Sequence, residues 1–84
     1  MNIYVANLGF NVQDEDLKKC FSRYGEVASI SIIIDKITNR SRGFGFVMMN
    51  DPKAAETAIR ELNGITLDNR IIRVKENQAK RRIS

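Results

Sequence analysis

Apolar and polar positions alternate along some stretches of the chain and recur every three to four residues along others. Residues 14–25 and 51–64 carry apolar side chains at positions i, i+3, i+4 and i+7, which is the spacing of one helix face. Four other stretches, rich in β-branched or alternating apolar residues, predict strands at 2–8, 27–35, 42–50 and 70–76. The predicted order is therefore strand, helix, strand, strand, helix, strand.

The first predicted helix has recognisable ends. It opens with the acidic run Asp14 to Asp16, which the positive end of the helix dipole favours, and it stops at Gly25. Its apolar stripe consists of Leu17, Cys20, Phe21 and Tyr24. We expect this stripe to enter the core, with Cys20 as a small buried apolar residue.

The second helix is delimited in the same way. Asp51 is the predicted N-cap, Pro52 occupies the first helical position, and the pair Asn63 and Gly64 ends the helix. Its core-facing stripe consists of Ala55, Ala58, Ile59 and Leu62.

The order βαββαβ predicts an α+β fold of the ferredoxin-like type, a four-stranded antiparallel sheet with two helices on one face. Two helices can cover only one face of such a sheet. The other face must meet solvent or a partner, so its residues are the ones that decide function.

Side-chain alternation separates the two faces clearly in two strands. The apolar sides contain Ile30, Ile32, Ile34, Ile72 and Val74. The opposite sides contain Ser31, Ile33, Asp35, Ile71, Arg73 and Lys75. We expect the sides that carry serine, arginine and lysine to form the open face.

The strands at 2–8 and 42–50 are ambiguous, because both of their sides are apolar. Phe44, Phe46 and Met48 alternate with Gly45, Val47 and Met49, and Tyr4 and Ala6 alternate with Ile3 and Val5. Periodicity leaves open whether the phenylalanines belong to the core. Arg42 shares their side, and because an arginine is rarely buried unpaired, this favours exposure.

Composition indicates one globular domain. Hydrophobic residues make up 43% and charged residues 29% of 84 residues, and no apolar run is long enough to span a membrane. Residues 1–10 lack the features of a signal peptide, so we expect a complete small protein. The net charge of +4 is concentrated in Lys80, Arg81 and Arg82, within a predicted basic, flexible tail at 78–84. Such charge suits nucleic acid, a membrane surface or an acidic protein.

Several kinds of chemistry are excluded or disfavoured. Without histidine and with Cys20 as the single cysteine, the chain offers no histidine-based catalytic pair, no imidazole or thiolate-pair metal site and no internal disulfide. It also lacks a phosphate-binding G-x-x-x-x-G-K-[ST] loop. We therefore expect no enzyme and no cofactor. A lone thiol suits a reducing compartment, with the cytoplasm as the expected location and the nucleus or an organelle still open.

Two short segments together resemble a known family. The segment "RGFGFVMM" at 42–49 is similar to the octamer of the RNA recognition motif, [KR]-G-[FY]-[GA]-F-V-x-[FY], and departs from it only at Met49. The segment "IYVANL" at 3–8 resembles the family's hexamer, with Tyr4 at the aromatic position. The resemblance covers residues 2–77, and we assign 1–77 to the domain.

The resemblance implies that single-stranded RNA binds the open face. Tyr4 and Phe46 would each stack a base, Phe44 would contact the sugars between them, and Arg42 would pair with a phosphate. We attribute Gly43 and Gly45 to close approach of the nucleotide backbone. Further candidates, each also explicable as an ordinary solvated residue, are Met48, Asn2, Ser31, Arg73, Lys75 and Asn77 on the sheet and Lys36 and Arg40 in the loop. At Asn69 the family often has glycine, so a positive φ is expected there.

Other hypotheses remain open. Single-stranded DNA remains an alternative ligand, because stacking does not distinguish the sugars. We expect it to bind more weakly than RNA. A protein partner could bind the helical face, which carries acids at positions 14, 15, 16, 56 and 61. The favoured hypothesis is a monomeric RNA-binding domain that acts as an RNA chaperone or stabiliser.

Overall fold

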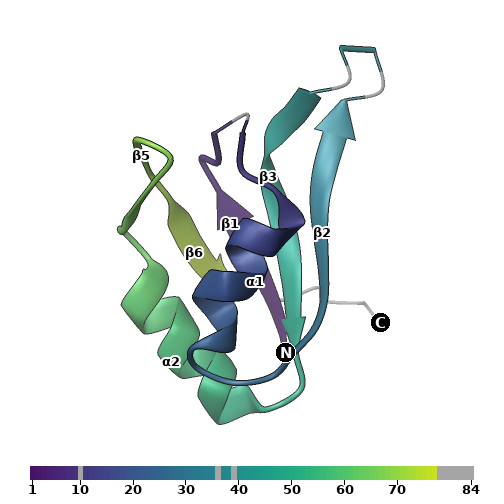
Figure 1. Ribbon diagram of the computed structural model, residues 1–84. Helices are drawn as coiled ribbons and strands as arrows, with labels where there is room; N and C mark the ends of the chain where they lie inside the picture. Colours follow the sequence, from purple (N-terminus) through teal and green to yellow (C-terminus); the bar gives the residue numbers. More distant parts are fainter. Residues whose placement is uncertain (10, 36, 39, 78–84) are drawn as a thin grey trace, which may run out of the picture.

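The computed structural model describes residues 1–9, 11–35, 37–38 and 40–77, with the backbone alone at 35 and 40–42. Its centre is a four-stranded antiparallel sheet in the order β2-β3-β1-β6, and both helices lie against one face of it (Figure 1). The elements of this sandwich are β1 (Asn2–Ala6), α1 (Asp14–Ser22), β2 (Val27–Asp35), β3 (Arg40–Met49), α2 (Pro52–Leu62) and β6 (Arg73–Glu76). The predicted fold is confirmed. The predicted tail at 78–84 lies outside the described residues.

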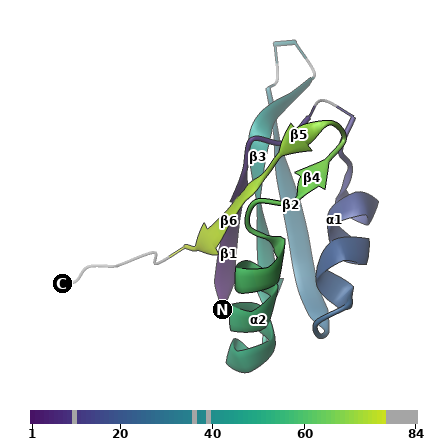
Figure 2. The same cartoon turned by 90° about the vertical axis from the view of Figure 1, so that its left-hand side faces the viewer.

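The last predicted strand, 70–76, is divided in the structure. Its beginning pairs as β5 (Arg70–Ile71) with β4 (Thr66–Leu67), in a small hairpin that the sequence pattern did not predict (Figure 2). Asp68 and Asn69 form the turn, with φ of 54° and 64°. Two consecutive residues with positive φ are typical of a tight two-residue hairpin turn. The positive φ expected at Asn69 is therefore confirmed, and the strand divides because Ile72 pairs outside the sheet.

The core lies between the helices and one side of each central strand. Ile3, Val5, Val47 and Met49 are fully buried, as are Leu17 and Phe21 of α1 and Ala55 and Ala58 of α2. Ile72 and Val74 extend this layer from the C-terminal side of the sheet. The predicted helix stripes thus face the core, with Cys20, Tyr24 and Ile59 partly buried at its margin. Desolvation by burial raises the pKa of the Cys20 thiol.

The alternation predicted for β2 holds only for part of the strand. Ile30 and Ile32 pack against the core, but Ile34 is 48% exposed. The pairing of β2 with β3 shifts register between Ile32 and Ile34, and such an irregularity changes the direction of the following side chains. This end of the β2–β3 hairpin also projects beyond both helices (Figures 1 and 2).

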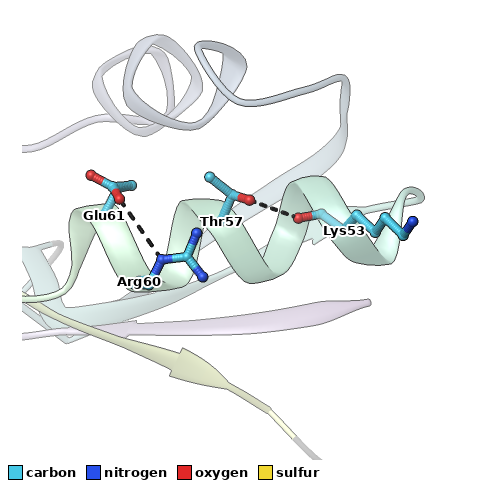
Figure 3. Close-up of polar contacts among 4 residues, drawn as sticks. All are labelled: Lys53, Thr57, Arg60 and Glu61. Carbon is cyan, nitrogen blue, oxygen red and sulfur yellow. Dashed lines mark hydrogen bonds and ion pairs between the residues drawn. The ribbon is translucent and has the colours of Figure 1, made fainter.

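The outward face of α2 is polar (Figure 3). Thr57 Oγ1 donates a hydrogen bond to the Lys53 carbonyl at 3.0 Å, and Arg60 Nε lies 3.8 Å from Glu61 Oε2. Both charged side chains of that pair are exposed, so the pair contributes little to stability. At the helix start, the Asp51 carboxylate accepts from the Lys53 amide at 3.0 Å, which confirms the predicted N-cap. No helix among the described residues is long and apolar enough to cross a membrane.

The connection that follows α2 hydrogen-bonds to Val74 of β6 and to Ile72, the residue before this strand. The Val74 amide donates to Asn63 Oδ1 at 3.0 Å. The Ile72 amide donates to the Ile65 carbonyl at 3.0 Å, and the Ile72 carbonyl accepts from the Gly64 amide at 2.9 Å. These bonds satisfy backbone groups that an edge strand would otherwise present to other chains. They also fix the position of β6 relative to the end of α2.

Candidate nucleic-acid interface

Three aromatic side chains gather on the sheet face opposite the helices. The register of β1 with β3 sets Tyr4 opposite Phe46 and Ala6 opposite Phe44. The ring centroids are 5.7 Å apart for Tyr4 and Phe46, 5.9 Å for Tyr4 and Phe44, and 6.2 Å for Phe44 and Phe46. All three pairs are tilted or edge-on, which is a favourable arrangement for aromatic pairs. We call these residues the aromatic cluster.

The aromatic cluster is half-buried, unlike the residues that alternate with it. Val47, between Phe46 and Met48, is fully buried against the helices, and so is Ile3 beside Tyr4. The ambiguity of β1 and β3 is therefore resolved: the aliphatic set forms the core, and the aromatic set lies on the open face. Each ring rests on its neighbours and on the sheet, and each keeps accessible surface.

Gly45 serves the protein's own backbone, which differs from the interpretation given to it above. Gly45 is buried and faces the helix side with Val47. A Cβ atom there would lie 2.7 Å from the Ser31 carbonyl oxygen and 3.0 Å from Ile32 Cα. Glycine is therefore required by the close approach of β2, not by a nucleotide. Gly43 has a φ of 92°, a backbone conformation that side chains disfavour.

Cationic side chains border the aromatic cluster on β6. Lys75 pairs with Tyr4 in the sheet register, and Arg73 pairs with Ala6. The Lys75 ammonium lies 5.6 Å from the centroid of the Tyr4 ring, within the range of a cation–π contact. Both cations are exposed. A ligand stacked on Tyr4 would therefore have positive charge beside it.

The other candidate residues of the sheet lie around the same cluster. Asn2 pairs with Met48, and the Asn77 amide donates to the Asn2 carbonyl at 2.8 Å, so these three lie together at one end of the face. Ser31 pairs with Phe46 and is exposed. Lysine and arginine, asparagine amides and a serine hydroxyl thus surround the rings, and all of them can hydrogen-bond to bases or phosphates.

The structure does not describe the side chains of the remaining candidates. Lys36 lies outside the described residues, and at Arg40 and Arg42 the structure describes only the backbone of β3. Their proposed RNA contacts stay predictions from the sequence. Within the described part of the chain, no three histidine, cysteine, aspartate or glutamate residues group so as to hold a metal ion.

A hollow, which the sequence pattern did not indicate, lies beside the aromatic cluster. It has a volume of about 570 Å³ and is lined by Tyr4, Ala6, Asn63, Gly64, Ile71, Ile72, Arg73, Val74 and Lys75. Alternation along 70–76 does place Ile71 on the open face with Arg73 and Lys75. No sequence pattern indicated that Asn63 and Gly64 line the hollow, because in the sequence they mark only the end of a helix.

Comparison with known proteins agrees with this geometry. The family model of the RNA recognition motif matches residues 3–73. Glycine-rich RNA-binding protein 8 of Arabidopsis thaliana is 47% identical over 77 residues, which cover 92% of this chain and 46% of that protein. The chain thus spans about half the length of that relative.

Solved structures show the same likeness. The crystal structure of the RNA-binding protein PG1 has a TM-score of 0.89 and 45% identity, and the match covers 98% of this chain and 99% of that one. A Sxl-lethal protein–RNA complex has a TM-score of 0.84 and 33% identity, over 90% of this chain and 47% of that one. The chain belongs to the RNA recognition motif family.

Proposed function

We propose that this protein binds single-stranded RNA across the open face of its sheet. The observation that carries the proposal is the aromatic cluster, three half-exposed rings that contact one another and are bordered by Lys75. Stacking of a base on such a ring contributes about 1–3 kcal/mol and requires an unpaired base. The relatives named above include a protein solved with RNA bound.

Each ring has a separate role in the proposal. Tyr4 and Phe46, on neighbouring strands, each stack one base, and Phe44 contacts the sugars between them. Stacking hardly discriminates between bases, so specificity falls to hydrogen bonds from the polar residues around the rings. These are Asn2, Ser31, Arg73, Lys75 and Asn77, with Met48 as an apolar contact.

Phosphate contacts are assigned to three cations, in β3 and in the connection before it. Arg42 pairs with a phosphate as a charged fork. Lys36, which lies between β2 and β3 in the sequence, and Arg40, the first residue of β3, hold the RNA strand. Binding of this kind weakens as salt rises, because each neutralised phosphate releases counterions.

The biological role that fits best is that of an RNA chaperone or stabiliser, acting as a monomer and without catalysis. A single domain that reads a few nucleotides binds modestly and exchanges readily. We keep a reducing compartment, with the cytoplasm first, as the proposed location, because the lone thiol of Cys20 suits it. Single-stranded DNA is expected to bind more weakly, since contacts to the 2′-hydroxyl would be lost.

A two-dimensional NMR titration tests the proposal. Labelled protein receives short randomised RNA pools and, in parallel, DNA pools of the same length. We expect shifts on β1 and β3, and an affinity reduced about 5- to 150-fold in Phe46→Ala, the equivalent of one stacked base. Glu61→Gln, on the outward face of α2, is the matched control and should bind like the original protein.

Two outcomes would contradict RNA binding by this face. Shifts restricted to α1 and α2 would indicate a ligand on the helical side, and a basic protein partner would then become the leading hypothesis. Equal affinity in the original protein and in Phe46→Ala would exclude the aromatic cluster as the site of stacking.

A further inference from the structure

Asn63 and Gly64 form the one Asn-Gly pair in the sequence, and they follow directly after the last residue of α2. An asparagine before a glycine is prone to deamidation, because glycine has no side chain to hinder attack by its backbone nitrogen on the neighbouring side-chain amide. Both residues are exposed and line the hollow, so water reaches them. The pair therefore has the composition and the access of a deamidation site.

The reaction is intramolecular and uses groups of the chain and water alone. The Gly64 nitrogen attacks Cγ of Asn63, so a C–N bond forms, the attacking nitrogen loses its proton and the side-chain nitrogen leaves as ammonia. Water then opens the resulting succinimide at either of its two carbonyl carbons. The products are aspartate and isoaspartate, and the net change is the gain of one water and the loss of one ammonia.

The folded backbone holds the attacking nitrogen away from its target. Ring closure requires the Gly64 nitrogen to eclipse Cβ of Asn63 across the bond between Cα and the carbonyl carbon. The ψ of Asn63 is 120°, which turns this nitrogen away from the side chain. The Gly64 amide also donates to the Ile72 carbonyl at 2.9 Å. Rotation into the reactive conformation would therefore break a hydrogen bond.

The side chain of Asn63 is held by the same segment of the chain. Its Oδ1 accepts from the Val74 amide at 3.0 Å, in a partly buried contact. Residues 72–74 thus bind both the attacking nitrogen and the amide that it would attack. Separation of this segment from the end of α2 releases both groups together and leaves ψ of Asn63 free to rotate.

We propose that Asn63 is a deamidation site that is closed while residues 72–74 are bonded to the end of α2 and opens when β6 separates from it. Local openings of this kind occur in folded proteins at a lower free energy than global unfolding. The rate of deamidation therefore measures how often β6 detaches. The inference does not depend on the proposed binding of RNA.

The two products differ in their effect on the fold. An aspartate at position 63 keeps a side-chain oxygen that accepts from the Val74 amide. An isoaspartate adds one methylene group to the backbone before Gly64, which moves the Gly64 amide away from the Ile72 carbonyl. Formation of isoaspartate therefore prevents full closure of β6 onto the end of α2, and a single opening leaves a permanent change in the chain.

Incubation in mildly alkaline buffer tests the site. The folded protein is compared with a synthetic peptide of residues 60–67, which contains the same Asn-Gly pair without the fold. Proteolysis followed by liquid chromatography and mass spectrometry resolves asparagine, aspartate and isoaspartate at position 63. We expect conversion in the folded protein to be at least about 100-fold slower than in the peptide, because only the opened fraction reacts.

Two variants separate the opening of β6 from unfolding of the whole domain. Val74→Ala keeps the amide that donates to Asn63 but weakens the packing of β6, since Val74 is 2% exposed. Leu17→Ala is the matched control, because it removes a fully buried side chain from α1 instead. Urea denaturation gives the stability of each, and low urea added to the more stable variant equalises them. At equal stability we expect Val74→Ala to deamidate at least about fivefold faster.

Each contrary result overturns a defined part of the proposal. Equal rates in the folded protein and the peptide would show that the folded geometry gives no protection. Equal rates in Val74→Ala and Leu17→Ala would assign the opening to global unfolding and refute the role of β6. A peptide that is not converted would refute the site itself. Failure of the protein to bind RNA would leave all of these results unchanged.

Discussion

The two faces of the central sheet are made from alternate residues of the same strands, and they differ in what covers them. On one face Ile3 and Val47 are fully buried beneath the helices. On the other, their neighbours Tyr4 and Phe46 are half-buried, with ring centroids 5.7 Å apart and a lysine beside them. Both faces are apolar in β1 and β3, so hydrophobicity does not distinguish them. The difference is shape: aliphatic side chains fill a core, whereas flat rings keep a surface on which another ring can stack.

The largest effect on stability should come from the sheet face that the helices cover. Ile3→Ala removes a fully buried side chain and should lower the free energy of unfolding by about 2–5 kcal/mol, because a cavity remains. Its neighbour Tyr4→Ala should cost clearly less stability and instead lose RNA affinity. Urea denaturation and RNA titration of both variants measure the contrast. A stability loss in Tyr4→Ala as large as that in Ile3→Ala would show that the ring is a core residue.

A second test concerns Gly45. In the sequence it stands between Phe44 and Phe46, but in the structure it lies on the sheet face that the helices cover. Gly45→Ala should lower the free energy of unfolding by about 1–3 kcal/mol, because the new Cβ would crowd the backbone of β2. The RNA affinity of the folded fraction should stay unchanged. Reduced affinity at full stability would instead support the view that this glycine admits the nucleotide backbone.

Charge on the open face is tested by salt. For single strands, log affinity falls with log salt at a slope near −0.7 for each neutralised phosphate. Arg42→Ala should therefore make the slope shallower by about 0.7. Arg60→Ala, an exposed arginine on the outward side of α2, should leave it unchanged. If the Arg42 variant keeps the original slope, Arg42 has no phosphate contact.

The smallest expected effect lies at the margin of the core and appears at alkaline pH. Burial raises the pKa of the Cys20 thiol, so the folded protein keeps this proton at pH values where the unfolded chain releases it. The contribution of this group to stability is complete below the ordinary thiol pKa of about 8.5 and declines above it. The stability difference between the protein and Cys20→Ala should shrink over that range in denaturation curves. A difference that stays constant with pH would contradict this.

The spacing of apolar residues and the alternation of side chains along strands predicted the element order, both helix stripes and the open sides of β2 and β6. These features could be predicted because each depends on neighbouring residues within one element. The predictions failed where the structure depends on contacts between elements. Gly45 looks like part of a ligand motif until the approach of β2 is known, and Ile34 follows its strand's alternation only as far as the register shift. The hollow joins Ala6, Asn63 and Ile71, which are far apart in the sequence.

The position of β1 has a consequence for the order in which a ribosome could complete this site. The strand that bears Tyr4 is synthesised first, yet it pairs with β3 and with β6, the last strand of the sheet. Translation proceeds at about 5–20 residues per second, so Tyr4 waits several seconds for Lys75. Pairing over such sequence distances is established late. A nascent chain therefore contains the aromatic residues before they come together as the aromatic cluster. Affinity for RNA should therefore arise in one step, when the final strand emerges and the whole domain folds.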